Sequence, residues 1–259
     1  MKLPLFQVDA FTSRRFSGNP AAVCPLEKWL PDELMQSIAL ENNLSETAFF
    51  VREGDGFRIR WFTPTTEVDL CGHATLATAF VLFNELEKGS REVTFQSKSG
   101  PLRVTTDGAR ITLFFPRREP KEQKLPEAVK RALGGNPLEL HVAKDWMVLY
   151  GSAEEVRRLK PDMRLTAQLE ARGVIVTAKG DDCDFVSRFF VPGQGIDEDP
   201  VTGSAHCTLV PFWSQRLGKK TLHAKQVSAR GGELFCVDAG PIVEMSGHGA
   251  LYLRGEIDV

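Results

Sequence analysis

Two stretches of similar pattern, half the chain apart, constrain the fold more than any other feature. Residues 69–74 read Asp-Leu-Cys-Gly-His-Ala and continue as a mostly apolar segment of helical length to residue 83. Residues 199–205 read Asp-Pro-Val-Thr-Gly-Ser-Ala and continue in the same way to residue 213. Gly203 lies 131 residues after Gly72 in a chain of 259 residues. This spacing predicts a duplicated domain, and the alternative is two unrelated glycine turns in an α/β protein.

Each stretch has the chemistry of an anion site at the start of a buried helix. Glycine allows a tight turn and lets a ligand approach the backbone closely. The first amides of a helix have no intrahelical partner, and together with the helix dipole they favour negative charge. The apolar first turns predict burial on all sides. We therefore expect an α/β (α+β) chain of two pseudo-symmetric halves, each a sheet around its own central helix, with one anionic small molecule held in a cleft between them.

The segment 116–124 divides the two halves, because it is charged, flanked by prolines and free of large apolar residues. It is typical of an inter-domain linker. The predicted domains are residues 1–116 and residues 125–259, and the last strand of the second is able to return to the first. Pro211 falls inside the apolar segment after Gly203, where a proline should cost about 3 kcal/mol or force a kink. We therefore do not expect a regular helix there.

Composition excludes several classes of function. A formal charge of −2 gives no electrostatic footprint for nucleic acid or an acidic membrane surface. No apolar run reaches the roughly 18 residues of a membrane span. Pro4 and Asp9 interrupt the apolar core that a signal peptide needs, so we expect a cytoplasmic protein. The five cysteines are scattered without a CxxC pair, which indicates neither a disulfide framework nor a zinc ribbon.

Four polar residues are candidates for chemistry: Glu46, His73, Asp199 and Ser204. Glu46 lies where a strand enters the apolar core. A carboxylate there can take and return a proton, although a solvated strand end is the ordinary alternative. His73 at a helix start is expected to stay neutral and to donate one hydrogen bond, because the helix dipole disfavours imidazolium. Ser204 could cap its helix or bind a ligand.

Other kinds of site are disfavoured. A zinc site has enough residues by count, in Cys71, His73, His206 and Cys207, but the last two are adjacent on a helix and point about 100° apart. Ser204 does not lie in the GxSxG turn of a hydrolase. The nucleotide-binding patterns GxGxxG and GxxxxGK[ST] are absent. The sequence therefore predicts no metal and no cofactor.

Five short motifs, in order along nearly the whole chain, carry a family resemblance: Ser-Gly-Asn-Pro at 17–20, Asn-Leu-Ser-Glu-Thr at 43–47, Phe-Thr-Pro at 62–64, Cys-Gly-His at 71–73 and Glu-Asp-Pro-Val-Thr-Gly-Ser at 198–204. With them the chain resembles the PhzF-like isomerases, named for phenazine biosynthesis. The resemblance implies the diaminopimelate-epimerase-like fold, with two pseudo-symmetric domains, each a curled mixed sheet around a central helix. It also implies a cofactor-free isomerase that forms a homodimer.

The same resemblance implies roles for particular residues. Those at catalytic positions are Glu46, His73, Asp199 and Ser204, and those at substrate-binding positions are Ser45, Gly72, Thr202 and Gly203. The implied substrate is a small molecule of the dihydroxy-dihydro-anthranilate type. The glutamate would take a proton from one ring carbon and return it to another.

Cys71 is the main departure from the pattern, because the phenazine enzyme has a small apolar residue there. Related epimerases and racemases use two thiols, one in each half. Cys71 occupies the first of those positions, but its mirror position holds Thr202, a poor base at neutral pH. A racemase that uses Cys71, and a metabolite-binding protein without catalysis, are the alternatives to a proton-shuttling isomerase.

Overall fold

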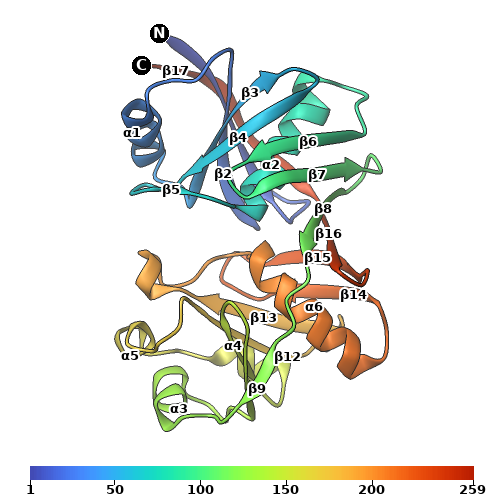
Figure 1. The fold of residues 1–259 in the computed structure, drawn as a ribbon. Coiled ribbons are helices and arrows are strands. Elements are labelled where there is room, and N and C mark those ends of the chain that lie inside the picture. The colour runs from blue at the N-terminus through green and yellow to red at the C-terminus, as the bar shows by residue number, and fades with distance from the viewer. The chain divides into compact units, whose positions relative to one another are not determined.

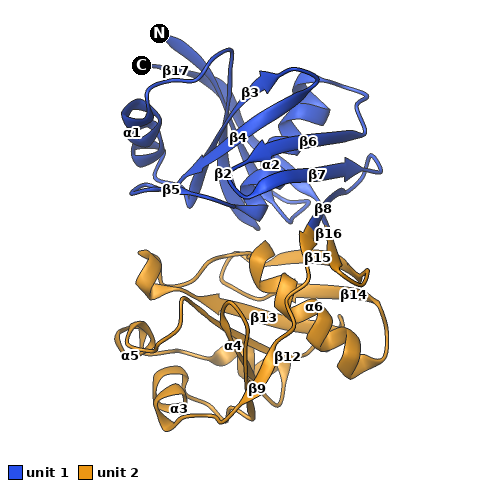
Figure 2. Cartoon of the chain, viewed as in Figure 1, with its two compact units in different colours: residues 1–114, 246–259 blue, residues 115–245 orange.

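The chain forms two compact units (Figure 2). A computed structural model describes residues 1–259. Unit 1 holds Met1–Phe114 and Ser246–Val259, and unit 2 holds Phe115–Met245. The chain leaves unit 1 within β8 (Ile111–Pro116) and returns to it within β16 (Ile242–Gly247). No helix is both long enough and apolar enough to span a membrane.

The segment expected to be a linker is partly structured. Its residues include β9 (Lys121–Gln123), which pairs antiparallel with β10 (Glu139–Val142). An exposed, charged strand has no apolar pattern, so it could not be recognised from the sequence.

Unit 1 is a mixed sheet in the order β17–β1–β2–β3–β4–β6–β7–β8, with β5 beside β4 (Figure 1). The pairs β2–β3 and β4–β6 are parallel, and the other pairs are antiparallel. The remaining elements are β1 (Lys2–Ala10), β2 (Asn19–Leu26), α1 (Asp32–Asn42), β3 (Glu46–Glu53), β4 (Gly56–Phe62), β5 (Glu67–Val68), α2 (Gly72–Val81), the π-helical turn η1 (Leu82–Leu86), β6 (Glu92–Ser97), β7 (Gly100–Thr106) and β17 (Gly249–Asp258).

Unit 2 repeats this plan in the order β9–β10–β11–β12–β13–β14–β15. Here β11–β12 and β13–β14 are the parallel pairs. The elements not yet named are α3 (Glu127–Leu133), β11 (Trp146–Leu149), α4 (Ala153–Arg158), α5 (Met163–Ala167), β12 (Val174–Lys179), β13 (Phe185–Phe190), the 3₁₀ turn η2 (Pro192–Gln194), α6 (Gly203–Leu217), β14 (Thr221–Gln226) and β15 (Gly232–Asp238).

The two units share one order of pairings, which supports the duplication predicted from the repeat. Parallel neighbours need a crossover connection, usually a helix. The crossover from β4 to β6 contains α2, and the crossover from β13 to β14 contains α6. The two stretches that first suggested a repeat are therefore the starts of equivalent helices.

Helix α2 is the buried centre of unit 1. It contacts β1, β2, β3 and β17, and eight of its ten residues are buried. Its two threonines satisfy their hydroxyls inside the helix: Thr75 donates to the carbonyl of Cys71 at 2.5 Å and Thr78 to that of Ala74 at 2.7 Å. Polar residues are thus tolerated where no water reaches them.

Helix α6 corrects the expectation drawn from Pro211, because it runs unbroken from Gly203 to Leu217. A proline removes the amide that would bind the carbonyl four residues earlier, here that of Cys207. The backbone amide of Arg118 donates to this carbonyl at 3.0 Å instead. The helix therefore tolerates the proline because a distant segment replaces the missing donor.

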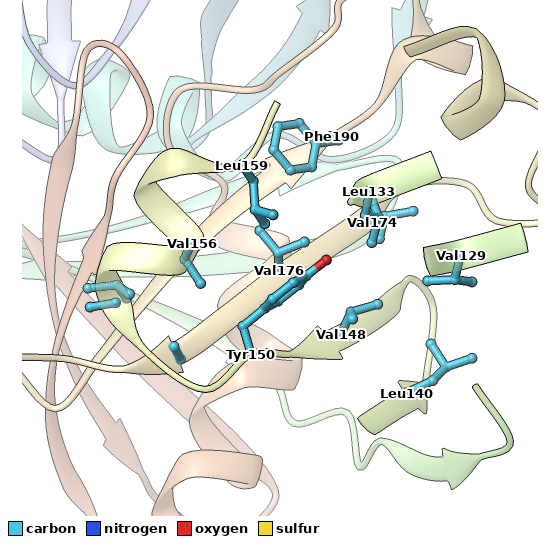
Figure 3. Close-up of a cluster of buried hydrophobic side chains, with 13 residues drawn as sticks. Val129, Leu133, Leu140, Val148, Tyr150, Val156, Leu159, Val174, Val176 and Phe190 are labelled. Carbon is cyan, nitrogen blue, oxygen red and sulfur yellow. The ribbon is translucent and has the colours of Figure 1, made fainter. Parts of the chain in front are cut away.

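Unit 2 has its own apolar core between the sheet and α3, α4 and α5 (Figure 3). Tyr150 lies among Val148 and Val176 in this cluster, and its hydroxyl donates to the carbonyl of Gly134 at 3.0 Å. In unit 1 a second cluster packs α1 against β2 and β3, with Met35 and Phe49 fully buried. Each unit thus buries enough apolar surface to hold its own sheet.

Candidate functional site

Three residues of unit 1 that the sequence offers for catalysis lie together at the start of α2. Glu46 is the first residue of β3, Cys71 is the N-cap of α2, and His73 is the second residue of the helix. Oε2 of Glu46 lies 3.1 Å from Nε2 of His73. Sγ of Cys71 lies 3.5 Å from Nδ1 of the same ring. The imidazole therefore stands between a carboxylate and a thiol.

The imidazole is buried and the carboxylate is partly buried, and the two groups are not aligned for a hydrogen bond with each other. The side chains of His73 and Glu46 are 5% and 17% exposed. Neither Oε2 of Glu46 nor Nε2 of His73 makes a hydrogen bond of acceptable angle. A buried polar atom without a partner costs free energy. A ligand with a hydrogen-bonding group at this place would therefore stabilise the pair by supplying the missing hydrogen bonds.

Asn19 holds the other side of the His73 ring. It is the first residue of β2, fully buried, and its Nδ2 lies 3.1 Å from Nδ1 of His73. An amide nitrogen only donates. In the neutral imidazole Nδ1 therefore accepts from Asn19, and Nε2 carries the proton towards Glu46.

Burial and charge act in opposite directions on His73. Burial is the largest influence and lowers the pKa of His73, but the neighbouring Cys71 and Glu46 together raise it further, and the net shift is upward. Burial, followed by the charge of Glu46, raises the pKa of Cys71 to about 11. Cys71 is then a neutral thiol at neutral pH. The upward shift of the His73 pKa differs from the neutral histidine expected from the helix dipole alone, because Cys71 and Glu46 both lie next to the ring.

The same three residues offer ligand atoms within 4.8 Å of one another, a distance that suits a metal ion. However, the thiol lies at Nδ1 and the carboxylate at Nε2. These two ring nitrogens point away from each other, so the histidine cannot share one ion with both neighbours as they stand. The arrangement fits an imidazole between two proton-carrying groups better than a metal centre.

The predicted residues of unit 2 cluster at the start of α6. The hydroxyl of Thr202 donates to Oδ2 of Asp199 at 2.5 Å, and the amide of Asp199 donates to the carbonyl of Phe189 at 3.0 Å. Ser204 does not cap the helix, since its hydroxyl has no hydrogen-bond partner and its side chain is partly exposed. A role for Ser204 in binding a ligand stays a prediction.

Both central helices begin without a side-chain cap. The N-cap residues Cys71 and Thr202 have extended backbones, and their side chains make no capping hydrogen bond. Gly72 and Gly203 follow them as the first helical residues. Ser45, half-buried just before Glu46, also has no hydrogen-bond partner. These groups keep the donors that the predicted binding of a carboxylate requires.

Comparison with known proteins fits this geometry. The family model for phenazine biosynthesis-like proteins matches residues 8–255. The chain belongs to this PhzF-like isomerase family. An uncharacterized isomerase of Pseudomonas aeruginosa is 54% identical over 99% of both chains. The crystal structure of a PhzF-family protein from Enterococcus faecalis is 48% identical, with a TM-score of 0.98 over 100% of both chains.

More distant structures share the fold alone. A hydroxyproline epimerase of Agrobacterium vitis is 12% identical, with a TM-score of 0.66 over 99% of this chain and 92% of its own. The PhzF-like resemblance and the epimerase-like fold predicted from the five motifs are therefore confirmed.

Three residues near the predicted positions of this PhzF-like chain were not singled out by sequence. Asn19 lay inside one of the quoted motifs and could have been noticed there. The sequence indicates His206 only as one of several possible metal ligands. In the structure its Nδ1 donates to the carbonyl of Thr202 at 2.8 Å. Gln226, at the end of β14, lies in no motif, and only the structure brings it to Thr202.

Proposed function

We propose that the chain is a cofactor-free isomerase that moves a proton on a small, carboxylated, unsaturated substrate, with Glu46 as the group that takes and returns the proton. The observation that carries this proposal is the buried oxygen of Glu46, 3.1 Å from Nε2 of His73 and without an aligned hydrogen bond. A general base has to reach the proton it abstracts without being held elsewhere. The hydroxylated dihydroanthranilates are the substrate class suggested by the family.

In the proposed reaction a single group, Glu46, both removes the proton and returns it. A C–H bond of the substrate breaks, Glu46 gains the proton, and the electron pair is delocalised as a dienolate that extends to the substrate carboxylate. Glu46 then gives the proton to another carbon, which leaves the double bonds shifted and the enzyme unchanged. His73 would orient Glu46. The amides at Gly72 and Gly203, with Ser45, Thr202, Ser204 and Asp199, are proposed to bind the substrate, because preorganised donors stabilise the developing negative charge.

A racemase that uses Cys71 is the second candidate, because this thiol lies 3.5 Å from His73. Two features weigh against it. The pKa of Cys71 is raised to about 11, which leaves little thiolate to act as a base. The equivalent position in unit 2 holds Thr202, whose hydroxyl proton is donated to Asp199.

Proton exchange tests the proposal. The wild type and Glu46→Gln are incubated in deuterated water with a panel of hydroxylated dihydroanthranilates, small carboxylated alkenes and amino acids, and mass spectrometry measures deuterium uptake. Glu53→Gln is a matched control, because Glu53 ends the same strand on the exposed surface. We expect uptake in the wild type and in Glu53→Gln, and a loss of at least a hundredfold in Glu46→Gln. Equal uptake in Glu46→Gln and wild type would refute the role of Glu46.

The alternatives give different results in the same assay. A racemase predicts uptake at an amino-acid α-carbon that Cys71→Ser abolishes and Glu46→Gln does not. A binding protein predicts a higher melting temperature with a ligand of the panel, but no uptake in any variant.

A further inference from the structure

Thr202, the N-cap of α6, has every polar group engaged within unit 2. Its amide donates to Oε1 of Gln226 at 2.9 Å. Its carbonyl is 2.8 Å from Nδ1 of His206, which donates to it. Its hydroxyl donates to Oδ2 of Asp199 at 2.5 Å, the short distance typical of a hydrogen bond to a charged oxygen. Thr202 is therefore fixed from three directions.

The hydrogen bonds around the hydroxyl can run in only one direction. A threonine hydroxyl has one proton, and that of Thr202 is donated to Asp199. Nε2 of Gln226 lies 3.2 Å from the same hydroxyl oxygen and can only donate to it. The result is a directed chain from the amide of Gln226 through the hydroxyl of Thr202 to the carboxylate of Asp199. Bonds in such a chain strengthen one another.

Gln226 also holds the backbone of Asp199, because Nε2 donates to its carbonyl at 2.8 Å. Gln226 is 1% exposed and lies at the end of β14, where it pairs with Ser187 on one side and Gly232 on the other. A buried amide whose groups are all satisfied on a central strand has little freedom to move. One rigid side chain thus fixes Asp199 at its backbone directly and at its carboxylate through Thr202.

We propose that Gln226 is a positioning residue for the reaction: it sets the direction of the Asp199 carboxylate through the hydroxyl of Thr202. The proposal rests on the proposed function, in which Asp199 binds the substrate. A purely structural amide needs only to satisfy the backbone of the turn. The second donor bond of Gln226 instead ends on a hydroxyl that itself donates to the carboxylate of Asp199. A small misplacement of such a group can cost about a hundredfold in rate.

Three variants test the chain of hydrogen bonds. Gln226→Glu keeps the size and the acceptor but loses the two donor bonds. Thr202→Val removes the hydroxyl, and the double variant removes both. Ser228→Ala is the matched control, because the hydroxyl of Ser228 donates to the carbonyl of Pro200 in the same turn at 2.8 Å without reaching Asp199.

The kinetic readout is kcat and KM for deuterium uptake with the best substrate of the panel, beside the denaturation midpoint. We expect kcat to fall about 10- to 100-fold in Gln226→Glu and in Thr202→Val. The double variant should lose less than the product of the two single losses, because one of the two donor bonds of Gln226 acts through that hydroxyl. Ser228→Ala should keep kcat within about twofold. A kcat of Gln226→Glu within twofold of wild type, or additive losses in the double variant, overturns the proposal.

A second readout is independent of turnover. The carboxyl ¹³C resonance of Asp199 reports its hydrogen bonds directly. It should move in Gln226→Glu and Thr202→Val and stay in place in Ser228→Ala and Glu46→Gln. An unmoved resonance in Gln226→Glu overturns the proposal, whether or not the exchange assay supports Glu46 as the proton shuttle.

Discussion

His206 should make the protein sensitive to mild acid, and the effect can be isolated with one substitution. The ring is completely buried in α6, with Phe185 5.9 Å away. Nδ1 donates to the carbonyl of Thr202, and Nε2 has no partner. A second proton on the ring would be placed on Nε2, where no acceptor receives it. Burial accordingly lowers the pKa of His206 from 6.5 to about 4, although the hydrogen bond to Thr202 acts in the opposite direction.

The sign of the effect follows from proton linkage. Below pH 6.5 the unfolded chain binds a proton at His206, whereas the folded chain does so only below about pH 4. The contribution of this histidine to stability is therefore complete above pH 6.5 and is lost as the pH falls to about 4. At 1.36 kcal/mol for each pKa unit, the unfolding free energy should fall by about 3 kcal/mol across this range.

The assay compares wild type with His206→Asn by guanidinium denaturation at several pH values from 7 to 4. The amide nitrogen of asparagine can replace Nδ1, so the bond to Thr202 is kept while the titration is removed. The variant should be less stable by about 2 kcal/mol at pH 7, because the ring leaves a cavity. That gap should close or reverse by pH 4. If the unfolding free energies of the two proteins fell in parallel as the pH is lowered, the reasoning would be refuted. The titration of His73 is present in both proteins, so it does not contribute to the difference between them.

Two further predictions concern Pro211 and Cys71. Pro211→Ala should change the unfolding free energy by less than about 1 kcal/mol in chemical denaturation, because the amide of Arg118 already donates to the carbonyl of Cys207. A proline without such compensation would cost roughly 3 kcal/mol. A gain in stability near 3 kcal/mol in the variant would contradict this reasoning. Iodoacetamide should alkylate Cys71 at pH 7.5 at least about a hundredfold more slowly in the folded than in the unfolded protein, since its pKa is raised to about 11. Peptide mapping measures both rates, and similar rates would show that the thiol is not held in this way.

The sequence was informative where a local rule was enough. The glycine followed by an apolar helical segment identified both central helices, because burial and turn formation act within a few residues. The fold class followed from the same repeat and is confirmed by the structural comparisons. Pro211 misled for the opposite reason, since its compensation comes from Arg118, far away in the sequence.

In the candidate site, too, the residues indicated by a local pattern could be predicted, and those brought together by the fold could not. Glu46 and His73 could be chosen from their places at a strand start and a helix start, and the structure brings them within 3.1 Å of each other. Their roles, like those of Asp199 and Ser204, stay predictions. Gln226 could not be chosen, because a glutamine at the end of a strand carries no pattern. Its three hydrogen bonds join it to two residues, Thr202 and Asp199, which lie 24 and 27 positions earlier in the chain.

The backbone amide of Arg118 that donates to α6 also explains a difference between the two central helices. The position equivalent to Pro211 in α2, 131 residues earlier, is Phe80, and α2 makes its own hydrogen bonds there. Proline is tolerated only in the half where another segment donates to the carbonyl of Cys207. The proline therefore makes α6 depend on the segment around Arg118, because without that segment the carbonyl of Cys207 would have no donor.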